Sequence, residues 1–228
     1  MSGHSRLRPR RYSGRNFYMS LKNILGCSLI SAALIIFGYF YLDTRLAEFV
    51  SEKVGSGFLL SEQVSNLPDL LLLLVIIITV VSWTGRLYLA AKHVNGPILN
   101  FLEYIGFAVP VAFISKHFLK QLFGRMNSRM WISHPDQFGF NWFQGGGDFS
   151  SFPSGHMAVI TVLMLGIGRY LPRLRPACAT VLFVLAAALI ITEYHFFSDI
   201  VAGVYLGLII DLLTWRGLAY LRHSNSEQ

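Results

Sequence analysis

The sequence predicts an all-α polytopic membrane protein with six transmembrane helices. Composition, six apolar segments and the gathering of polar motifs on one side of the membrane lead to this prediction. Of the 228 residues, 54% are hydrophobic and only 14% are charged. Soluble domains carry about 25% charged residues, so this chain lacks the polar surface of a water-soluble globule.

The composition also excludes other classes of protein. The chain is too apolar to be disordered, and its two cysteines lie within apolar runs and give no disulfide framework. A net charge of +7 is compatible with nucleic-acid binding. No basic stripe is interleaved with aromatic residues, however, so no nucleic-acid partner is expected.

Six apolar segments reach span length, alone or with their flanks, because a bilayer core about 30 Å thick takes roughly 20 helical residues. The first is free of charge, the second is nearly pure Leu, Val and Ile, and the fourth and fifth are short. The third and sixth enclose Glu103 and Asp211, which are expected to bond inside the bundle, Asp211 with Arg216 or another basic residue. The predicted spans are residues 24–42, 70–83, 98–115, 155–171, 177–191 and 200–215.

Positive charge sets the predicted orientation. With the N-terminus inside, thirteen of the nineteen lysines and arginines lie on the inner side, which places both termini in the cytoplasm. The first span is longer than the core of a signal peptide and precedes no small-residue cleavage site, so it is expected to be retained. We therefore expect a basic tail (1–22), one six-helix domain (23–222) and a short C-terminal tail (223–228). Residues 43–69 are expected to form a motif-free outer loop, with an interfacial amphipathic helix as the alternative.

Three polar clusters fall on the outer side under this topology. The basic cluster spans residues 120–129, the PSGH cluster spans residues 151–156 before the fourth span, and the His–Asp cluster spans residues 194–199 before the sixth. The PSGH and His–Asp clusters contain no lysine or arginine and took no part in the charge count, so their shared side is independent support for an active site at the non-cytoplasmic face.

The His–Asp cluster has the spacing of an oriented nucleophile. His195 and Asp199 are four residues apart, so a helical turn places them on one face. A carboxylate on one ring nitrogen fixes the tautomer and leaves the other nitrogen free to attack. The alternative is an interfacial histidine beside a helix-capping aspartate.

The other two clusters offer phosphate contacts. At a helix start, the Ser154 hydroxyl and the backbone at Gly155 favour an anion, and His156 is placed to protonate a leaving group. A turn with a helix cap is the alternative. Lys120 and Arg125 supply positive charge, with Arg129 as a third candidate, unless they only anchor a helix end among headgroups. The histidine spacing and the surrounding cations argue against a metal, so no metal or other cofactor is expected.

Residues 98–215 resemble the type 2 phosphatidic acid phosphatase superfamily. The motif Pro-Ser-Gly-His is complete at residues 153–156, and His195 and Asp199 match the third motif. The first motif has Asn127-Ser128 where the family has Arg-Pro, and Leu189 replaces the arginine of the third motif.

The resemblance implies a role for each matched residue. His195 would form a phospho-histidine, oriented by Asp199, and His156 would protonate the leaving group. The phosphate would be bound by Lys120, Arg125, Ser154 and Gly155, with Arg129 as an addition, and no metal would be needed.

The resemblance also implies the function. The chain would be a lipid phosphatase of the bacterial inner membrane, with its site facing the periplasm or exterior. The substrate would be phosphatidate, phosphatidylglycerophosphate, undecaprenyl pyrophosphate or lipid A. A phosphotransferase, or a catalytically impaired lipid-binding or transport protein, is the alternative.

Overall fold

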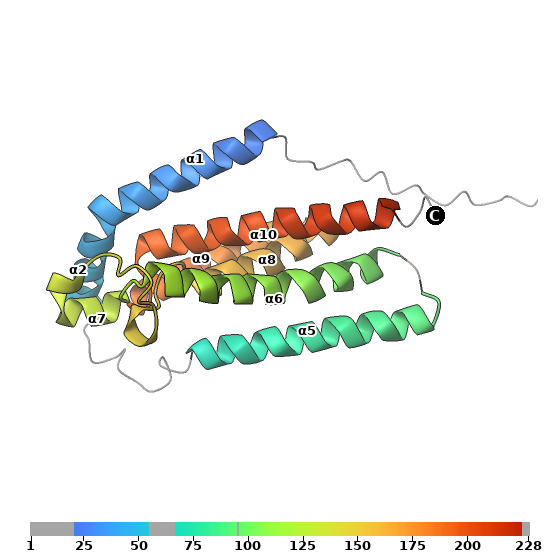
Figure 1. The fold of residues 1–228 in the computed structure, drawn as a ribbon, viewed down its shortest axis with the longest axis horizontal. Helices are drawn as coiled ribbons and strands as arrows, with labels where there is room; N and C mark the ends of the chain where they lie inside the picture. Colours follow the sequence, from blue (N-terminus) through green and yellow to red (C-terminus); the bar gives the residue numbers. More distant parts are fainter. Residues whose placement is uncertain (1–20, 55–66, 95, 225–228) are drawn as a thin grey trace, which may run out of the picture.

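The computed structural model describes residues 21–54, 67–94 and 96–224, and it is helical almost throughout (Figure 1). One antiparallel bridge, between Arg125 and Phe140, is the only strand-like pairing in these residues, so the all-α prediction is confirmed. A π-helical turn, Gly38–Leu42, joins the first two helices, and short 3-10 turns lie at Pro135–Gln137, Gly147–Phe149 and Pro172–Leu174. The α-helices are α1 (Leu21–Phe37), α2 (Asp43–Val54), α5 (Leu67–Ala91), α6 (Pro97–Phe123), α7 (Ser128–Ser133), α8 (Gly155–Tyr170), α9 (Arg175–Ile191) and α10 (Phe197–Ser224).

Helix α8 lies at the centre of the bundle, packed against α6, α9 and α10 (Figure 1). Glycines let α10 approach it closely. A β-carbon at Gly203 would overlap the Ser154 carbonyl oxygen, and one at Gly207 would crowd Thr161. This close approach holds the start of α10 against the start of α8, where the predicted motifs lie.

The outer helix faces carry large apolar side chains. Leu29 of α1 is 71% exposed, Ile77 of α5 is 50% exposed and Phe183 of α9 is 75% exposed. Apolar surface on this scale is typical of helices that face lipid. Five described helical segments are long and apolar enough to cross a bilayer: Leu21–Val54, Asp69–Ala91, Pro97–Phe123, Pro172–Ile191 and Phe197–Ser224.

The structure bears on two of the predicted segments. The fourth span corresponds to α8, which has 16 residues and at 1.5 Å per residue is about 24 Å long, so six full spans stay a prediction. Residues 43–54 of the predicted outer loop form a helix, α2, which agrees with the amphipathic helix that was the alternative for this segment. The rest of that loop up to residue 66, the tail up to residue 20 and residues 225–228 lie outside the described residues.

Charges within the spans are paired inside the bundle, as predicted. Asp211 binds both terminal nitrogens of Arg169, at 2.7 and 2.6 Å, and accepts a hydrogen bond from Tyr104. Glu103 lies between Arg86 and Arg222, at 3.3 and 2.8 Å. These pairs hold together helices α5, α6, α8 and α10.

Candidate active site

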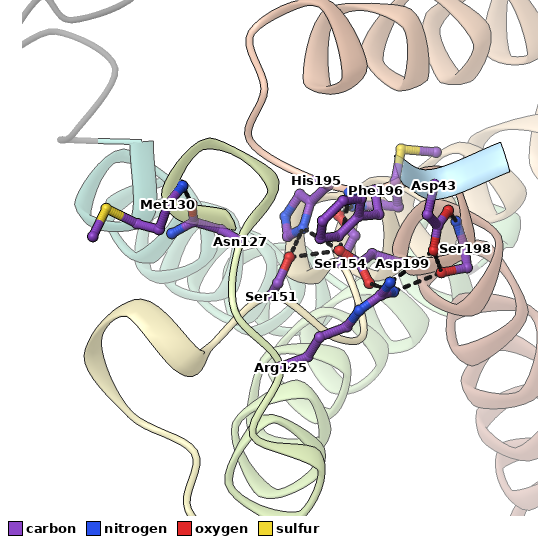
Figure 2. Close-up of polar contacts among 11 residues, drawn as sticks. Asp43, Arg125, Asn127, Met130, Ser151, Ser154, His195, Phe196, Ser198 and Asp199 are labelled. Atoms are coloured by element: carbon purple, nitrogen blue, oxygen red, sulfur yellow. Dashed lines mark hydrogen bonds and ion pairs between the residues drawn. The ribbon is translucent and has the colours of Figure 1, made fainter. Parts of the chain in front are cut away.

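The loops at one end of the bundle bring the three clusters together (Figure 2). The basic cluster follows α6, the PSGH cluster begins α8, and the His–Asp cluster joins α9 to α10. The backbone N–H of Ser154 donates to the Asp199 carbonyl at 3.0 Å, and the N–H of Ser151 donates to the Arg125 carbonyl at 2.9 Å. Backbone hydrogen bonds therefore join all three clusters.

His195 reaches Asp199 through a serine. The Ser151 hydroxyl donates to Asp199 Oδ2 at 2.5 Å and lies 3.1 Å from His195 Nδ1, while Nδ1 and Oδ2 are 3.5 Å apart (Figure 2). Because the single hydroxyl hydrogen is donated to Asp199, Ser151 Oγ can only accept from His195. Nδ1 therefore carries the ring proton, and Nε2 keeps its lone pair.

The second ring nitrogen of His195 is poised for chemistry. His195 is only 2% exposed, and within the described part of the chain its Nε2 is buried without a hydrogen-bond partner. Burial lowers the pKa of this imidazole, against the opposing bond and charge of Asp199. At neutral pH the ring is neutral, which is the state that a nucleophile requires.

His195 also lines a polar cavity of about 270 Å³. Lys116 and Lys120 give one wall a positive charge. Apart from one glycine, every residue that lines the cavity has a side chain that ends in a cation, an imidazole, an amide or a hydroxyl. The lining residues are Lys116, His117, Lys120, Gln121, Asn127, Gly147, Ser150, Ser151, Tyr194 and His195.

Arg125 lies behind His195, and it does not line this cavity. Its guanidinium is 2.6 Å from Asp199 Oδ1 and 2.7 Å from Asp43 Oδ2, and it is 1% exposed (Figure 2). Ser198 accepts from the same guanidinium at 2.6 Å and donates to Asp43. Both terminal nitrogens of Arg125 are thus bound by protein oxygens, whereas the sequence placed this residue on the phosphate.

Aromatic rings enclose the Arg125 guanidinium. They lie 4.4 to 5.4 Å from its central carbon and include Phe196, next to the nucleophile. Cation–π contacts favour a charge in such a site. The rings are those of Tyr39, Phe138, Phe140 and Phe196.

The PSGH cluster starts α8 beside the nucleophile. Ser154 is the N-cap of this helix and accepts from the backbone N–H of Met157, so the helix-cap reading of this serine is confirmed. Gly155 follows at the first helical position, and the His156 ring centroid is 6.3 Å from that of His195. The helix start, with its positive dipole end, therefore lies next to the His195 ring.

The two remaining predicted cations have different positions. Lys120 lies in the last turn of α6 and lines the cavity. Arg129, on α7, donates to the Thr192 carbonyl at 3.0 Å, and its backbone N–H donates to Glu193. Arg129 thus holds the segment that carries His195, and it is not among the residues that line the cavity.

The residues at the two altered motif positions have structural partners. Asn127 is the N-cap of α7, accepting from the Met130 N–H at 2.9 Å. Leu189 is 3% exposed within an apolar cluster, and its carbonyl accepts from the backbone N–H groups of Tyr194 and His195. The side chain at position 189 therefore packs in the core beneath the site.

Sequence reasoning overlooked Asp43, Ser151, Ser198 and Lys116 as site residues. Asp43 is 82 positions from its partner Arg125, and nothing local signals that contact. Its position directly after a charge-free span was the one available hint, because a carboxylate there needs a partner. Lys116 was counted only as an outer positive charge.

Apolar helices whose loops hold a buried His–Asp pair beside a lysine-lined cavity are consistent with one class of protein, the membrane phosphatases. The chain belongs to the PAP2 superfamily, whose family model matches residues 101–223. That match includes all three clusters.

The chain is similar to a lipid A 1-phosphatase from Rhizobium johnstonii, with 29% identity over 111 residues. The alignment covers 49% of this chain and 45% of that relative, so the chain spans less than half of the relative's length. Among solved structures, it is similar to a transmembrane PAP2-type phosphatidylglycerolphosphate phosphatase from Bacillus subtilis. That similarity has 17% identity, a TM-score of 0.36, and coverage of 89% of this chain and 88% of the other.

Proposed function

We propose that this protein is an integral-membrane lipid phosphatase that works through a phospho-histidine at His195. The observation that carries the proposal is the buried Nε2 of this residue, which has no partner in the described structure and belongs to a ring that lines a lysine-bearing cavity. A neutral imidazole with a free lone pair attacks phosphorus, and lysines favour the anionic group that it attacks.

The first chemical step transfers the phosphoryl group to the enzyme. His195 Nε2 forms a bond to phosphorus, and the bond from phosphorus to the lipid oxygen breaks. His156 donates a proton to that departing oxygen. The positive charge that develops on the His195 ring is stabilised by Asp199 through Ser151, along the hydrogen bonds described above.

The second step releases phosphate. Water attacks the phospho-histidine, His156 accepts a proton from it, and the phosphorus–nitrogen bond breaks to give inorganic phosphate and free His195. Lys120, the Ser154 hydroxyl and the Gly155 amide hold the phosphoryl oxygens through both steps, and Arg129 holds the segment that carries His195. No step in this scheme needs a metal ion.

Arg125 receives a different role from the one that its sequence suggested. We assign it as a positioning residue, because its guanidinium is bound to Asp43 and Asp199 behind the nucleophile. By fixing Asp199, it fixes the tautomer and the orientation of His195. This assignment also gives Asp43 a function.

The substrate is a lipid phosphate monoester or pyrophosphate, of the phosphatidate, phosphatidylglycerophosphate, undecaprenyl pyrophosphate or lipid A type. Similarity to a lipid A 1-phosphatase supports the last of these. The excess of positive charge on the inner segments supports an inner-membrane protein with cytoplasmic termini and a site that faces the periplasm or exterior.

The test is phosphate release by detergent-purified protein from a panel of these lipids, with a chelator present. His195→Ala should lower release at least about 10³-fold, as loss of a nucleophile does. His134→Ala, which changes an exposed histidine in the adjoining loop, is the matched control and should keep wild-type activity. Near-normal release by His195→Ala would refute the mechanism, and loss of release with chelator would refute metal independence.

A second candidate function is a lipid-binding or transport protein with impaired catalysis. Asn127 and Leu189 favour it, because they stand where the resembling family has arginines. Lipid binding without phosphate release, unchanged by His195→Ala, would support this alternative. Phosphate that is found on an acceptor lipid instead of in water would identify a phosphotransferase.

A further inference from the structure

A second lysine lines the cavity one helical turn before Lys120. Lys116 is on α6 and is only 4% exposed, yet it lines the same cavity as His195. Residues four apart lie on one helix face, so both lysines extend from the same side of α6. The mechanism described above uses only Lys120.

The positive charge of Lys116 is not neutralised by the described part of the protein. None of the described carboxylates forms an ion pair with its ammonium group, and the ring of Phe113 lies 4.2 Å from Nζ. A buried charge without a counter-ion is costly, so such groups mark sites where a ligand supplies the opposite charge.

The position of Lys116 relative to α8 indicates which ligand. Its side chain crosses Gly155 so closely that a β-carbon there would overlap it, and Nζ would lie 3.3 Å from that carbon. Gly155 is the first residue of a 16-residue helix, where free N–H groups and the helix dipole favour anions. The ammonium and the helix start therefore act on the same volume.

We propose that Lys116 binds the phosphoryl group of the substrate, next to the start of α8, and supplies the positive charge that Leu189 cannot. The ligand is a phosphoryl dianion held between Lys116, Lys120 and the α8 N-terminus. This inference rests on the proposed function. It also explains Gly155, because any side chain at that position would displace the lysine.

The competing explanation is a structural lysine held by Phe113. The two explanations predict opposite changes in stability. A structural lysine stabilises the fold, so its replacement lowers the melting temperature. A lysine kept for a ligand is a cost to the empty fold, so an apolar side chain of similar length leaves the melting temperature unchanged or raises it.

The experiment measures binding of inorganic phosphate to the full-length protein in detergent, by calorimetry, together with KM, kcat and melting temperature. For Lys116→Met, we expect phosphate binding and KM to weaken about tenfold to a hundredfold, the range of a charged hydrogen bond. The melting temperature without phosphate should not fall. Lys116→Arg should recover most of the affinity because it restores the charge.

Lys92→Met removes an exposed lysine at the other end of the molecule and is the matched control, with wild-type affinity expected. Lys116→Gln is a second variant, which keeps a polar end without the charge and should weaken phosphate binding as Lys116→Met does. Unchanged phosphate affinity, or a lower melting temperature with unchanged affinity, would overturn the proposal.

The binding assay separates this inference from the proposed function. If wild type binds phosphate through Lys116 but releases none from any lipid, the inference holds and the phosphatase assignment fails. If wild type does not bind phosphate, or if release is normal and Lys116→Met binds phosphate as wild type does, the inference fails.

Discussion

Arginine–aspartate pairs lie at both ends of the bundle, and their surroundings differ. At the loop end, Arg125 joins Asp43 and Asp199, and the hydrogen bonds continue through Ser151 to a histidine. At the opposite end, Arg169 binds both oxygens of Asp211, and no histidine is attached among the described contacts.

The difference between the two ends lies in which buried groups have bonding partners. Buried ion pairs occur in both regions, so a buried charge alone does not mark the active site. The loop end differs because its network stops at an unpartnered nitrogen of His195, beside two lysines that no described carboxylate neutralises. The two ends therefore differ in whether polar groups are left without a bonding partner among the described residues, and not in whether they hold buried charges.

The largest expected effect is the difference between two arginine variants. Arg125→Met leaves two buried carboxylates unpaired, which should cost about 3–5 kcal/mol in the free energy of unfolding and lower kcat strongly. Arg169→Met removes a partner whose side chain is 22% exposed and should cost about 1–3 kcal/mol, with kcat of the folded protein within about twofold of wild type. Denaturant unfolding and phosphate release measure both, and equal losses of kcat would remove the distinction between the ends.

Ser151→Ala should break the contact between the nucleophile and its carboxylate. Without the hydroxyl, His195 Nδ1 loses its nearest acceptor, so we expect kcat to fall about tenfold to a hundredfold with KM nearly unchanged. Ser82→Ala, which removes a buried hydroxyl from α5, should leave kcat at the wild-type value. A change in KM alone would instead place Ser151 on the substrate.

The pH dependence tests the lowered pKa of His195. Activity needs the neutral ring, so the acid limb of kcat/KM should lie below pH 6.5, the ordinary value for histidine. The lowered pKa of His195 also makes the stability of the fold depend on pH. The contribution of His195 to stability is complete above about pH 6.5 and is lost as the pH falls through the lowered pKa of the folded state. Rate profiles and thermal melts from pH 4 to pH 8 measure both, and an acid limb above pH 6.5 would contradict the burial argument.

The smallest expected effect is at Asn127. Asn127→Ala removes the N-cap of α7 and should cost about 1 kcal/mol in stability. Phosphate release should stay within about threefold of wild type, because Arg129 and the backbone still hold the neighbouring segment. Asn127→Ser keeps a capping oxygen without adding charge to the cavity that Asn127 lines, and it is the control. A large loss of activity in Asn127→Ala alone would assign this side chain to the substrate.

Local sequence patterns predicted the helices and the contact between His195 and Asp199. Apolar runs give helices of predictable length, and a four-residue spacing brings two side chains onto one turn, where Nδ1 and Oδ2 are indeed 3.5 Å apart. The same reasoning predicted that the three clusters belong together. The three clusters lie at one end of the bundle because each is next to a helix end on the same side of the predicted topology. The hydropathy pattern determines that topology.

Long-range partners were beyond prediction. A guanidinium binds a phosphate and a carboxylate equally well, so the sequence around Arg125 did not show which of the two this side chain binds. Asp43 lies at the end of an apolar run, and only the packing of α2 beside the loops brings it to that arginine. Lys116 likewise differs from an ordinary interfacial lysine only through its burial against Gly155.

The pairing of Arg125 with both Asp43 and Asp199 has a consequence for biogenesis. Asp43 begins α2, near the start of the described residues, and Asp199 lies in α10, the last helix that the structure describes. We expect the Arg125 guanidinium to bind its second carboxylate only after α10 has been synthesised and has docked. The orientation of His195 is fixed at the same step. We therefore expect the hydrogen-bonded network around His195 to be incomplete until α10 has docked against the other helices.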